Sequence, residues 1–395
     1  MKTLNELKDL FLKEVSEIKG TAFDFNYDLA EHPEISGQEF ETVKKIFAIL
    51  DNNNIKFEKE LAGLPTAFRA TIKEAPNSDV KIGIIMEFDA LPEVGHACGH
   101  SASGSISLLS ALALARLNEE LDANIDLIGT PDEEVAGRKI DLANQGYFND
   151  YNFVIMIHMN SQVTYPSLQF LALSDMEMNF TGATAHASAS PWEGRNALNG
   201  AMLALHGMDM LRQHVKTDTR ISSIITRGGE STNVVPGKAQ VQTVMRSSSR
   251  AYLDEVIKKV KNCADGAALA TETQVEYHPI NADFADMKLN EPGIEAIRSV
   301  MRELNIPFEE DDKSMLGSSD IGNVSHVCPA FHPMLAITDK YLPLHSKEFA
   351  DVMKSDHIKE VIENGAKIIG FFILTALKEP GLLDKIKTDF GKNNN

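Results

Sequence analysis

The segment Lys81-Ile82-Gly83-Ile84-Ile85-Met86-Glu87-Phe88-Asp89 is an apolar run that ends in acidic residues. Neither face of this run is polar, which is typical of a strand buried on both sides of a sheet. A strongly apolar helix is expected next, at 106–117, then a strand at 125–128, a short helix at 138–145 and another buried strand at 153–157. Strands that alternate with helices predict a mostly parallel sheet between helical layers.

The pattern of apolar and polar residues changes near Ser174, where strands with one polar face begin. Residues 177–181 alternate between apolar and polar side chains, as a half-exposed strand does. The elements expected after them are a helix at 197–211, strands at 223–226 and 239–245, a helix at 252–270 and a strand at 273–277. This β-α-β-β-α-β order is typical of a small ferredoxin-like α+β domain.

The pattern of the first part of the chain, helices alternating with apolar strands, then returns, with a helix expected at 294–304 and a strand at 331–338. The predicted fold is therefore α/β, with a mostly parallel sheet flanked by helices. We expect a catalytic domain made of residues 1–174 and 289–395, interrupted by an inserted domain of residues 175–288. A chain of 395 residues is long enough for two such cores.

Composition restricts the classes of partner. The chain has 38 basic and 57 acidic residues, which give a formal net charge of -19. A field of this sign repels phosphate, so nucleic acid and anionic membranes are not expected partners. A small anionic substrate remains compatible, because one local arginine is enough to bind it.

The three cysteines, Cys98, Cys263 and Cys328, are odd in number and far apart. A disulfide framework is therefore not expected, and a reducing cytoplasm fits the sequence best. The first ten residues lack the apolar core of a signal peptide. No run approaches the roughly 18 apolar residues of a membrane span.

Residues of metal-ligand type follow the expected strands, at the sheet edge where ligands bind in such folds. Gly95-His96-Ala97-Cys98-Gly99-His100 places a thiol and an imidazole two residues apart, and Pro131-Asp132-Glu133-Glu134 places carboxylates side by side. His158 and His345 each follow an apolar segment. Together these groups can hold a zinc-like metal and leave one carboxylate to act on water.

Each feature also has a simpler interpretation when taken alone. Cys98 and His100 are also typical of a buried thiol and a capping histidine, and adjacent glutamates are typical of a solvated face. His158 and His345 are each typical of a hydrogen-bonded core histidine. A nucleotide-binding loop is disfavoured, because no Gly-x-x-x-x-Gly-Lys or Gly-x-Gly-x-x-Gly stands near Cys98. Four such features in one chain favour a metal site.

At this level of detail the sequence resembles the M20 metallopeptidases, specifically their amidohydrolase branch. The motifs that carry the resemblance run along nearly the whole chain, at 32–36, 87–92, 96–100, 130–134, 182–188, 233–237 and 344–346. Glu87-Phe88-Asp89, Gly137-Arg138-Lys139-Ile140 and residues 317–325 look most similar to the p-aminobenzoyl-glutamate hydrolase subgroup. The overall length is similar to that of the HmrA-type aminohydrolases.

The resemblance implies a site for two divalent metal ions, either zinc or manganese. The ligands that it implies are Cys98, His100, Glu134, His158 and His345. It further implies that Glu133 is the general base and that Asp89 orients a ligand.

The resemblance implies that the inserted domain is a lid that also pairs two chains, so that the protein is a homodimer or a larger homo-oligomer. His186 would reach an active site and stabilise the developing oxyanion. Asn233 and Arg246 would hold the carboxylate of the substrate. Without the resemblance, each of these three residues is equally typical of the surface of an inserted domain.

The function expected is hydrolysis of the amide bond of an N-acyl or aminoacyl amino acid, including acyl-glutamates. Two alternatives remain open: a dipeptidase or aminopeptidase of the same family, and a metal-poor binding protein with weak catalysis. Two residues depart from the family pattern. Ser101 stands where relatives carry aspartate or asparagine, and Asp132 stands where they carry alanine. The charge of Asp132 is expected to raise the pKa of Glu133.

Overall fold

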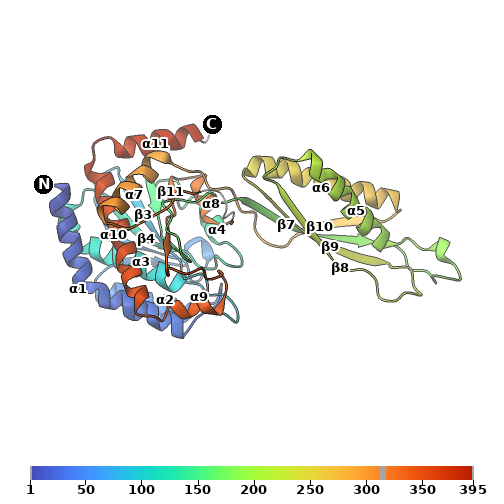
Figure 1. Cartoon of the computed structure of the whole chain (residues 1–395), viewed down its shortest axis with the longest axis horizontal. Coiled ribbons are helices and arrows are strands. Elements are labelled where there is room, and N and C mark those ends of the chain that lie inside the picture. Colours follow the sequence, from blue (N-terminus) through green and yellow to red (C-terminus); the bar gives the residue numbers. More distant parts are fainter. Residues whose placement is uncertain (1, 312–316, 394–395) are drawn as a thin grey trace. The chain divides into compact units, whose positions relative to one another are not determined.

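The structure, a computed structural model, describes residues 2–311 and 317–393, and its backbone separates into two units (Figure 1). The larger unit takes in the chain up to Gln169, resumes at Met287 and continues from Asn323; the smaller unit comprises Phe170–Asp286 and Gly317–Gly322. The smaller unit therefore differs from the predicted insertion of residues 175–288 in also containing a short later segment. The role of this unit as a lid stays a prediction.

The later segment is bound to the smaller unit by specific contacts. The Leu171 N–H donates a hydrogen bond to the Gly317 carbonyl at 2.8 Å, and Arg246 donates one to Ser318 Oγ at 2.9 Å. The backbone of Gly322 lies so close to Ala285 that a Cβ at Gly322 would stand 2.1 Å from the Ala285 carbonyl oxygen. These contacts depend on tertiary structure, so no local pattern reveals them.

A six-stranded sheet runs through the larger unit. Its strand order is β1 (Lys56–Lys59), β2 (Phe68–Lys73), β4 (Asn124–Gly129), β3 (Lys81–Met86), β5 (Phe153–Ile155) and β11 (Ala330–Phe331). The last four of these strands are parallel to one another, and β2, which pairs with both β1 and β4, is antiparallel to each. A separate parallel pair joins β6 (His158–Asn160) to β12 (Met334–Ala336). The prediction of a mostly parallel sheet is confirmed.

Helices surround this sheet. They are α1 (Leu4–Glu31), α2 (Phe40–Asn52), α3 (His100–Arg116), α4 (Lys139–Asn144), α7 (Glu291–Glu303), α9 (Lys347–Val352), α10 (His357–Lys378) and α11 (Leu382–Asn393). The short helix α8 (Ile321–Ser325) begins in the later segment of the smaller unit and ends in the larger one. Short 3₁₀ turns occur at Leu61–Gly63, Asn118–Glu120, Pro191–Glu193 and Arg212–His214. Helix α3 contacts β3 as well as α1 and α10, so it lies between the sheet and an outer helical layer.

The position of α3 explains its composition. Its residues from His100 to Leu114 are all buried, as expected for a helix that is covered on every side. Close packing of the outer layer depends on Gly370 in α10, where a Cβ would stand 2.1 Å from the ring of Phe11 in α1. The core so formed holds the strand ends, and therefore the loops that follow them, in fixed positions.

The smaller unit is an antiparallel sheet covered by two helices. Its strand order is β10 (Gln274–Pro279), β7 (Ala172–Thr181), β9 (Lys238–Ser247) and β8 (Arg220–Arg227), and its helices are α5 (Ala197–Leu211) and α6 (Arg250–Ala270). Alternate residues of β9, including Val241 and Met245, are buried against the helices. The predicted β-α-β-β-α-β order is confirmed.

Two of the predicted elements are wrong in detail. The strand expected at 331–338 is two short strands, β11 and β12, because Pro333 lacks the N–H that a continuing ladder needs. The helix expected at 106–117 begins instead at His100, directly after Gly99, which has a φ of 84°. Residues 101–105 are small, so the apolar periodicity conceals the first turn.

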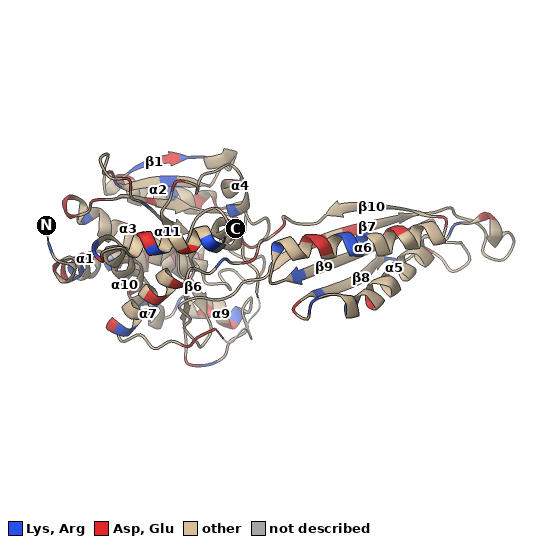
Figure 2. Cartoon of the chain, turned by 90° about the horizontal axis from the view of Figure 1, so that it is seen from above, with Lys and Arg blue, Asp and Glu red and all other residues tan. Residues whose placement is uncertain are grey.

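Acidic and basic residues both occur along α6 and α11 (Figure 2). Among residues 2–311 and 317–393, no helix combines the length and the apolar character needed to cross a lipid bilayer.

Candidate metal centre

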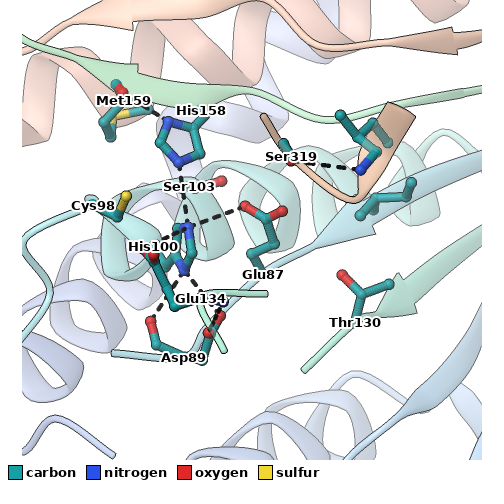
Figure 3. Close-up of polar contacts among 12 residues, drawn as sticks. Glu87, Asp89, Cys98, His100, Ser103, Thr130, Glu134, His158, Met159 and Ser319 are labelled. Atoms are coloured by element: carbon teal, nitrogen blue, oxygen red, sulfur yellow. Dashed lines mark hydrogen bonds and ion pairs between the residues drawn. The ribbon is translucent and has the colours of Figure 1, made fainter. Parts of the chain in front are cut away.

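The candidate ligands of the larger unit come from loops at the carboxyl ends of parallel strands. Asp89 follows β3, and the turn that contains Glu134 follows β4. His158 lies three residues beyond the end of β5, and His100 begins α3. Ligand sites are expected at this edge of an open α/β sheet, because the strands there end and their loops converge. Figure 3 shows these side chains directed toward one another.

His100 is fully buried and is oriented by Asp89. Its Nδ1 lies 2.9 Å from Asp89 Oδ1 and donates to that carboxylate, which leaves Nε2 facing the other candidate ligands. Burial acts to raise the pKa of Asp89, but the charge of His100 and several hydrogen bonds hold that pKa well below its usual range. Asp89 thus holds the imidazole of a candidate ligand in one orientation, and its predicted role in the site stays a prediction.

His158 faces His100 in the same way. Its Nδ1 donates to the Met159 carbonyl at 2.7 Å, which leaves a lone pair on Nε2. The Nε2 atoms of His158 and His100 lie 3.3 Å apart. A proton on one of these nitrogens, or a cation bound by both, can bridge two imidazoles at this distance. The arrangement therefore fits a metal ion that both imidazoles bind.

The remaining ligand candidates form a second, adjoining group. Cys98 Sγ lies 3.2 Å from His345 Nε2, and Glu134 Oε2 lies 3.7 Å from the same nitrogen. The ligand atoms of Cys98, His100 and His158 lie within 4.8 Å of one another, as do those of Cys98, Glu134 and His345. Cys98 belongs to both groups, as expected of a ligand shared by two ions.

One carboxylate oxygen and one thiol in this region lie in environments that a cation would improve. Glu134 Oε1 is buried and accepts no hydrogen bond from the described residues. Burial, followed by the charge of Glu134, raises the pKa of the Cys98 thiol well above its ordinary value. A bound divalent cation would satisfy the carboxylate and stabilise the thiolate. The donor set therefore fits the metal centre that the sequence predicted.

His345 lies in a loop, not at the end of a strand as its sequence context suggested. Its φ is 62°, a left-handed conformation that is uncommon for histidine and that costs of order 1 kcal/mol or more. The His345 N–H donates to the Ala97 carbonyl at 3.1 Å, which ties this loop to the one that carries Cys98. Strained backbone of this kind is concentrated at functional sites.

The turn that carries the paired glutamates is held by two buried carboxylates. The Glu134 N–H donates to Asp89 Oδ2 at 3.1 Å, and the Asp132 N–H donates to Glu39 Oε1 at 2.9 Å. Glu39 was not predicted, and burial raises its pKa to about 7. One carboxylate oxygen of Glu133, one of Glu134 and one ring nitrogen of His100 lie within 4.8 Å of one another. Glu133 is therefore beside the candidate ligands.

The two departures from the family pattern have different structural outcomes. Asp132 accepts the Ala136 N–H at 3.1 Å and pairs with Arg138 Nε at 3.2 Å, so a cation offsets the charge that it adds beside Glu133. Ser101 is fully buried in the first turn of α3, and its hydroxyl has no partner among the described residues.

The smaller unit brings two of its three predicted residues together. His186 forms a β-bridge with Val234, and the Ala187 N–H donates to the Asn233 carbonyl at 2.9 Å. The N–H groups of Ser188 and Ala189 donate to His186 Nδ1, so Nε2 carries the proton and remains a donor. A donor of this kind suits an oxyanion.

Arg246 lies at the opposite end of the same sheet. It is on β9 opposite Leu173 of β7, whereas Lys238, at the start of β9, lies opposite Thr181. Eight steps of about 3.3 Å separate Lys238 from Arg246, so the two ends are about 26 Å apart. Burial lowers the pKa of Arg246, and its guanidinium donates a hydrogen bond to Ser318 Oγ. Within one chain, Asn233 and Arg246 cannot hold the same small carboxylate.

Comparisons with known proteins agree with the fold. Residues 172–272 match the peptidase dimerisation domain of the M20 family. The Xaa-Arg dipeptidase of Mus musculus is 32% identical over 339 residues, which cover 83% of this chain and 78% of that protein. One of the two kinds of subunit of the p-aminobenzoyl-glutamate hydrolase of Escherichia coli is 28% identical, with 62% of this chain and 55% of that protein covered.

A dinuclear metal binding peptidase of the M20 family from Bacillus subtilis has a similar structure, with a TM-score of 0.72 and 19% identity. The match covers 92% of this chain and 99% of that one. The chain belongs to the M20 family of metallopeptidases, in its amidohydrolase branch. The family, the fold and a metal-dependent hydrolase predicted from the sequence are confirmed.

Proposed function

We propose that this protein hydrolyses the amide bond of an N-acyl or aminoacyl amino acid at a centre for two divalent ions. The observation that carries the proposal is the pair of adjoining ligand groups that share Cys98, with the carboxylate of Glu133 beside them. A thiolate kept as a ligand needs a reducing compartment, so we place the enzyme in the cytoplasm.

The roles of the residues follow from their positions. His100 and His158 would hold one ion, His345 and Glu134 the other, and Cys98 would contact both. Divalent ions in such a site supply Lewis acidity toward water and toward the amide carbonyl. Glu133 removes a proton from the attacking water and returns it to the leaving amine.

The substrate class is suggested by two relatives and one side chain. Hydrolysis of an acyl-glutamate is consistent with the p-aminobenzoyl-glutamate hydrolase relative, and an aminoacyl substrate is consistent with the Xaa-Arg dipeptidase, which is more similar to this chain. Both kinds of substrate can end in a carboxylate, and the half-buried guanidinium of Arg246 suits that anion. The ligand set and Glu133 argue against a metal-poor binding protein.

The test is metal analysis of the purified protein, followed by assays with acyl-glutamates and with dipeptides that end in arginine. Zinc or manganese is added in each assay. We expect up to two ions per chain and hydrolysis of at least one of the two substrate groups. A protein that binds no divalent ion at saturating concentrations, and that cleaves no amide, would contradict the proposal.

The smaller unit is proposed to pair two chains. Its edge strand β8 and its helix α5 expose apolar side chains, among them Met202, Met210 and Ile224. Apolar residues exposed beside an open strand edge favour association with a second copy. Because His186 and Arg246 lie at opposite ends of the sheet, a site that uses both residues needs one from each chain of a pair.

Complementation tests this arrangement. Glu133→Gln and His186→Ala chains are each expected to be inactive as homodimers. When subunits exchange, heterodimers contain one site with both residues intact, so the mixture should regain up to about one quarter of the wild-type activity. Exchange is followed with two differently tagged chains. If exchange occurs and no activity returns, His186 acts within its own chain or has no role in catalysis.

A further inference from the structure

Glu87 and Lys139 form an ion pair that the proposed function does not use. Lys139 Nζ lies 2.6 Å from Glu87 Oε1, and both side chains are fully buried. The two residues belong to the two short motifs that gave the sequence its resemblance to the p-aminobenzoyl-glutamate hydrolase subgroup. A fully buried lysine is rare, because its charge must be removed from water and compensated in place.

The second oxygen of Glu87 points at the metal centre. Glu87 Oε2 lies 3.4 Å from His100 Nε2, the nitrogen that also lies 3.3 Å from His158 Nε2 (Figure 3). This oxygen is buried and accepts no hydrogen bond from the described residues. A buried carboxylate oxygen without a donor is costly, and a cation at this position would remove the cost.

The distances are those of ligands around one ion. Two ligand atoms at about 2.0–2.2 Å from a tetrahedral ion stand about 3.3–3.6 Å apart. The separation of Glu87 Oε2 from His100 Nε2 lies in this range, as does the separation between His100 and His158. Glu87 is thus as well placed as His158 to share an ion with His100.

We propose that Glu87 is a further ligand of the ion held by His100, and that Lys139 is the positioning residue that aims it. Lys139 holds Oε1 and leaves Oε2 for the metal. This inference rests on the proposed metal centre and adds to it a carboxylate that none of the five predicted ligands includes.

A purely structural ion pair would have the same geometry, so the experiment must separate the two roles. Glu87→Gln alone leaves the charge of Lys139 buried and unpaired, which destabilises the fold for reasons unrelated to metal. The double variant Glu87→Gln/Lys139→Met removes both charges and keeps similar volumes. Lys8→Met/Glu303→Gln is the control for removing an ion pair elsewhere in the same unit, since Lys8 is buried and lies 2.6 Å from Glu303, whose side chain is 46% exposed.

Metal stoichiometry and affinity are measured by mass spectrometry and by titration with manganese, and the melting temperature is measured without metal. We expect the melting temperature of the metal-free double variant to be close to that of the metal-free wild type. The double variant should nevertheless bind one of the two ions about 10- to 100-fold more weakly than the wild type does. The control should bind both ions as the wild type does. A double variant with two ions at wild-type affinity would overturn the role of Glu87.

Anomalous diffraction from manganese-loaded wild-type crystals gives a test that needs no variant. We expect an ion at about 2.0–2.3 Å from Glu87 Oε2. An ion more than about 3 Å from both Glu87 oxygens would refute the assignment while leaving the proposed function intact. If the wild type binds no ion at all, the proposed function and the role of Glu87 fail together.

Discussion

Glu133→Gln is expected to retain the metal ions and to lose turnover by about 10²- to 10⁴-fold, the range for a missing general base. The amide has nearly the same shape as the carboxylate but cannot accept a proton from water. Glu133 lies near His100 and Glu134, and the backbone of its turn is held by Asp89 and Glu39. The substitution should therefore change the chemistry and leave the geometry of the turn intact. Steady-state kinetics and metal content, measured on the same sample, check both parts.

Glu134→Gln is the matched control, since it makes the same change in the next residue. The Glu134 oxygens lie 3.7 Å from His345 Nε2 and 3.9 Å from His100 Nε2. A neutral amide at this position should weaken metal binding first and reduce turnover as a consequence. Added manganese should then restore part of the activity of Glu134→Gln and none of the activity of Glu133→Gln. The opposite pattern would show that the two roles are exchanged.

The elements of the fold were predictable where side-chain periodicity was regular. Helix α5 was predicted with its observed bounds, because Ala197–Leu211 is apolar at helical spacing and Asn196 caps it. The start of α3 was not predicted, because small residues follow His100 and show no period. The short strands on either side of Pro333 were predicted as one, since apolar residues stand directly before and after His332 and Pro333.

The candidate site was predictable where residue type alone suggested a ligand. Cys98 and His100 were found in this way, and the structure brings them close to His158. The partners that hold such residues were not found. Glu39 binds the turn of Asp132 from 93 positions away in the sequence, and no local pattern shows such a contact.

The grouping of Asn233 with Arg246 shows a related limit. Sequence motifs assigned both residues to the substrate carboxylate, but the length of β9 separates them within one chain. Motifs identify which residues act together without specifying whether they belong to the same chain. The distance along the strand is what makes a two-chain site the consistent interpretation.

His100→Ala is expected to remove metal and activity together. His100 is the residue on which the buried contacts converge: Asp89 binds its Nδ1, while His158 and Glu87 face its Nε2. Without the imidazole, the ion that His100 would hold loses a nitrogen ligand. Metal affinity should therefore fall by more than about 10²-fold, which is a larger loss than removing a residue that only positions a ligand would cause. Hydrolysis should fall to background at metal concentrations that saturate the wild type.

The wild type stripped of metal with a chelator is the reference for the fold of His100→Ala. The helical and sheet signals of the two proteins should agree, because the apolar residues of α3 and β3 pack without the imidazole. The melting temperature of the wild type should rise when metal is added, since an ion that binds only the folded state stabilises it by mass action. That of His100→Ala should rise much less. A His100→Ala protein that keeps two ions would refute the ligand assignment, because the two buried imidazoles facing each other would then need another explanation.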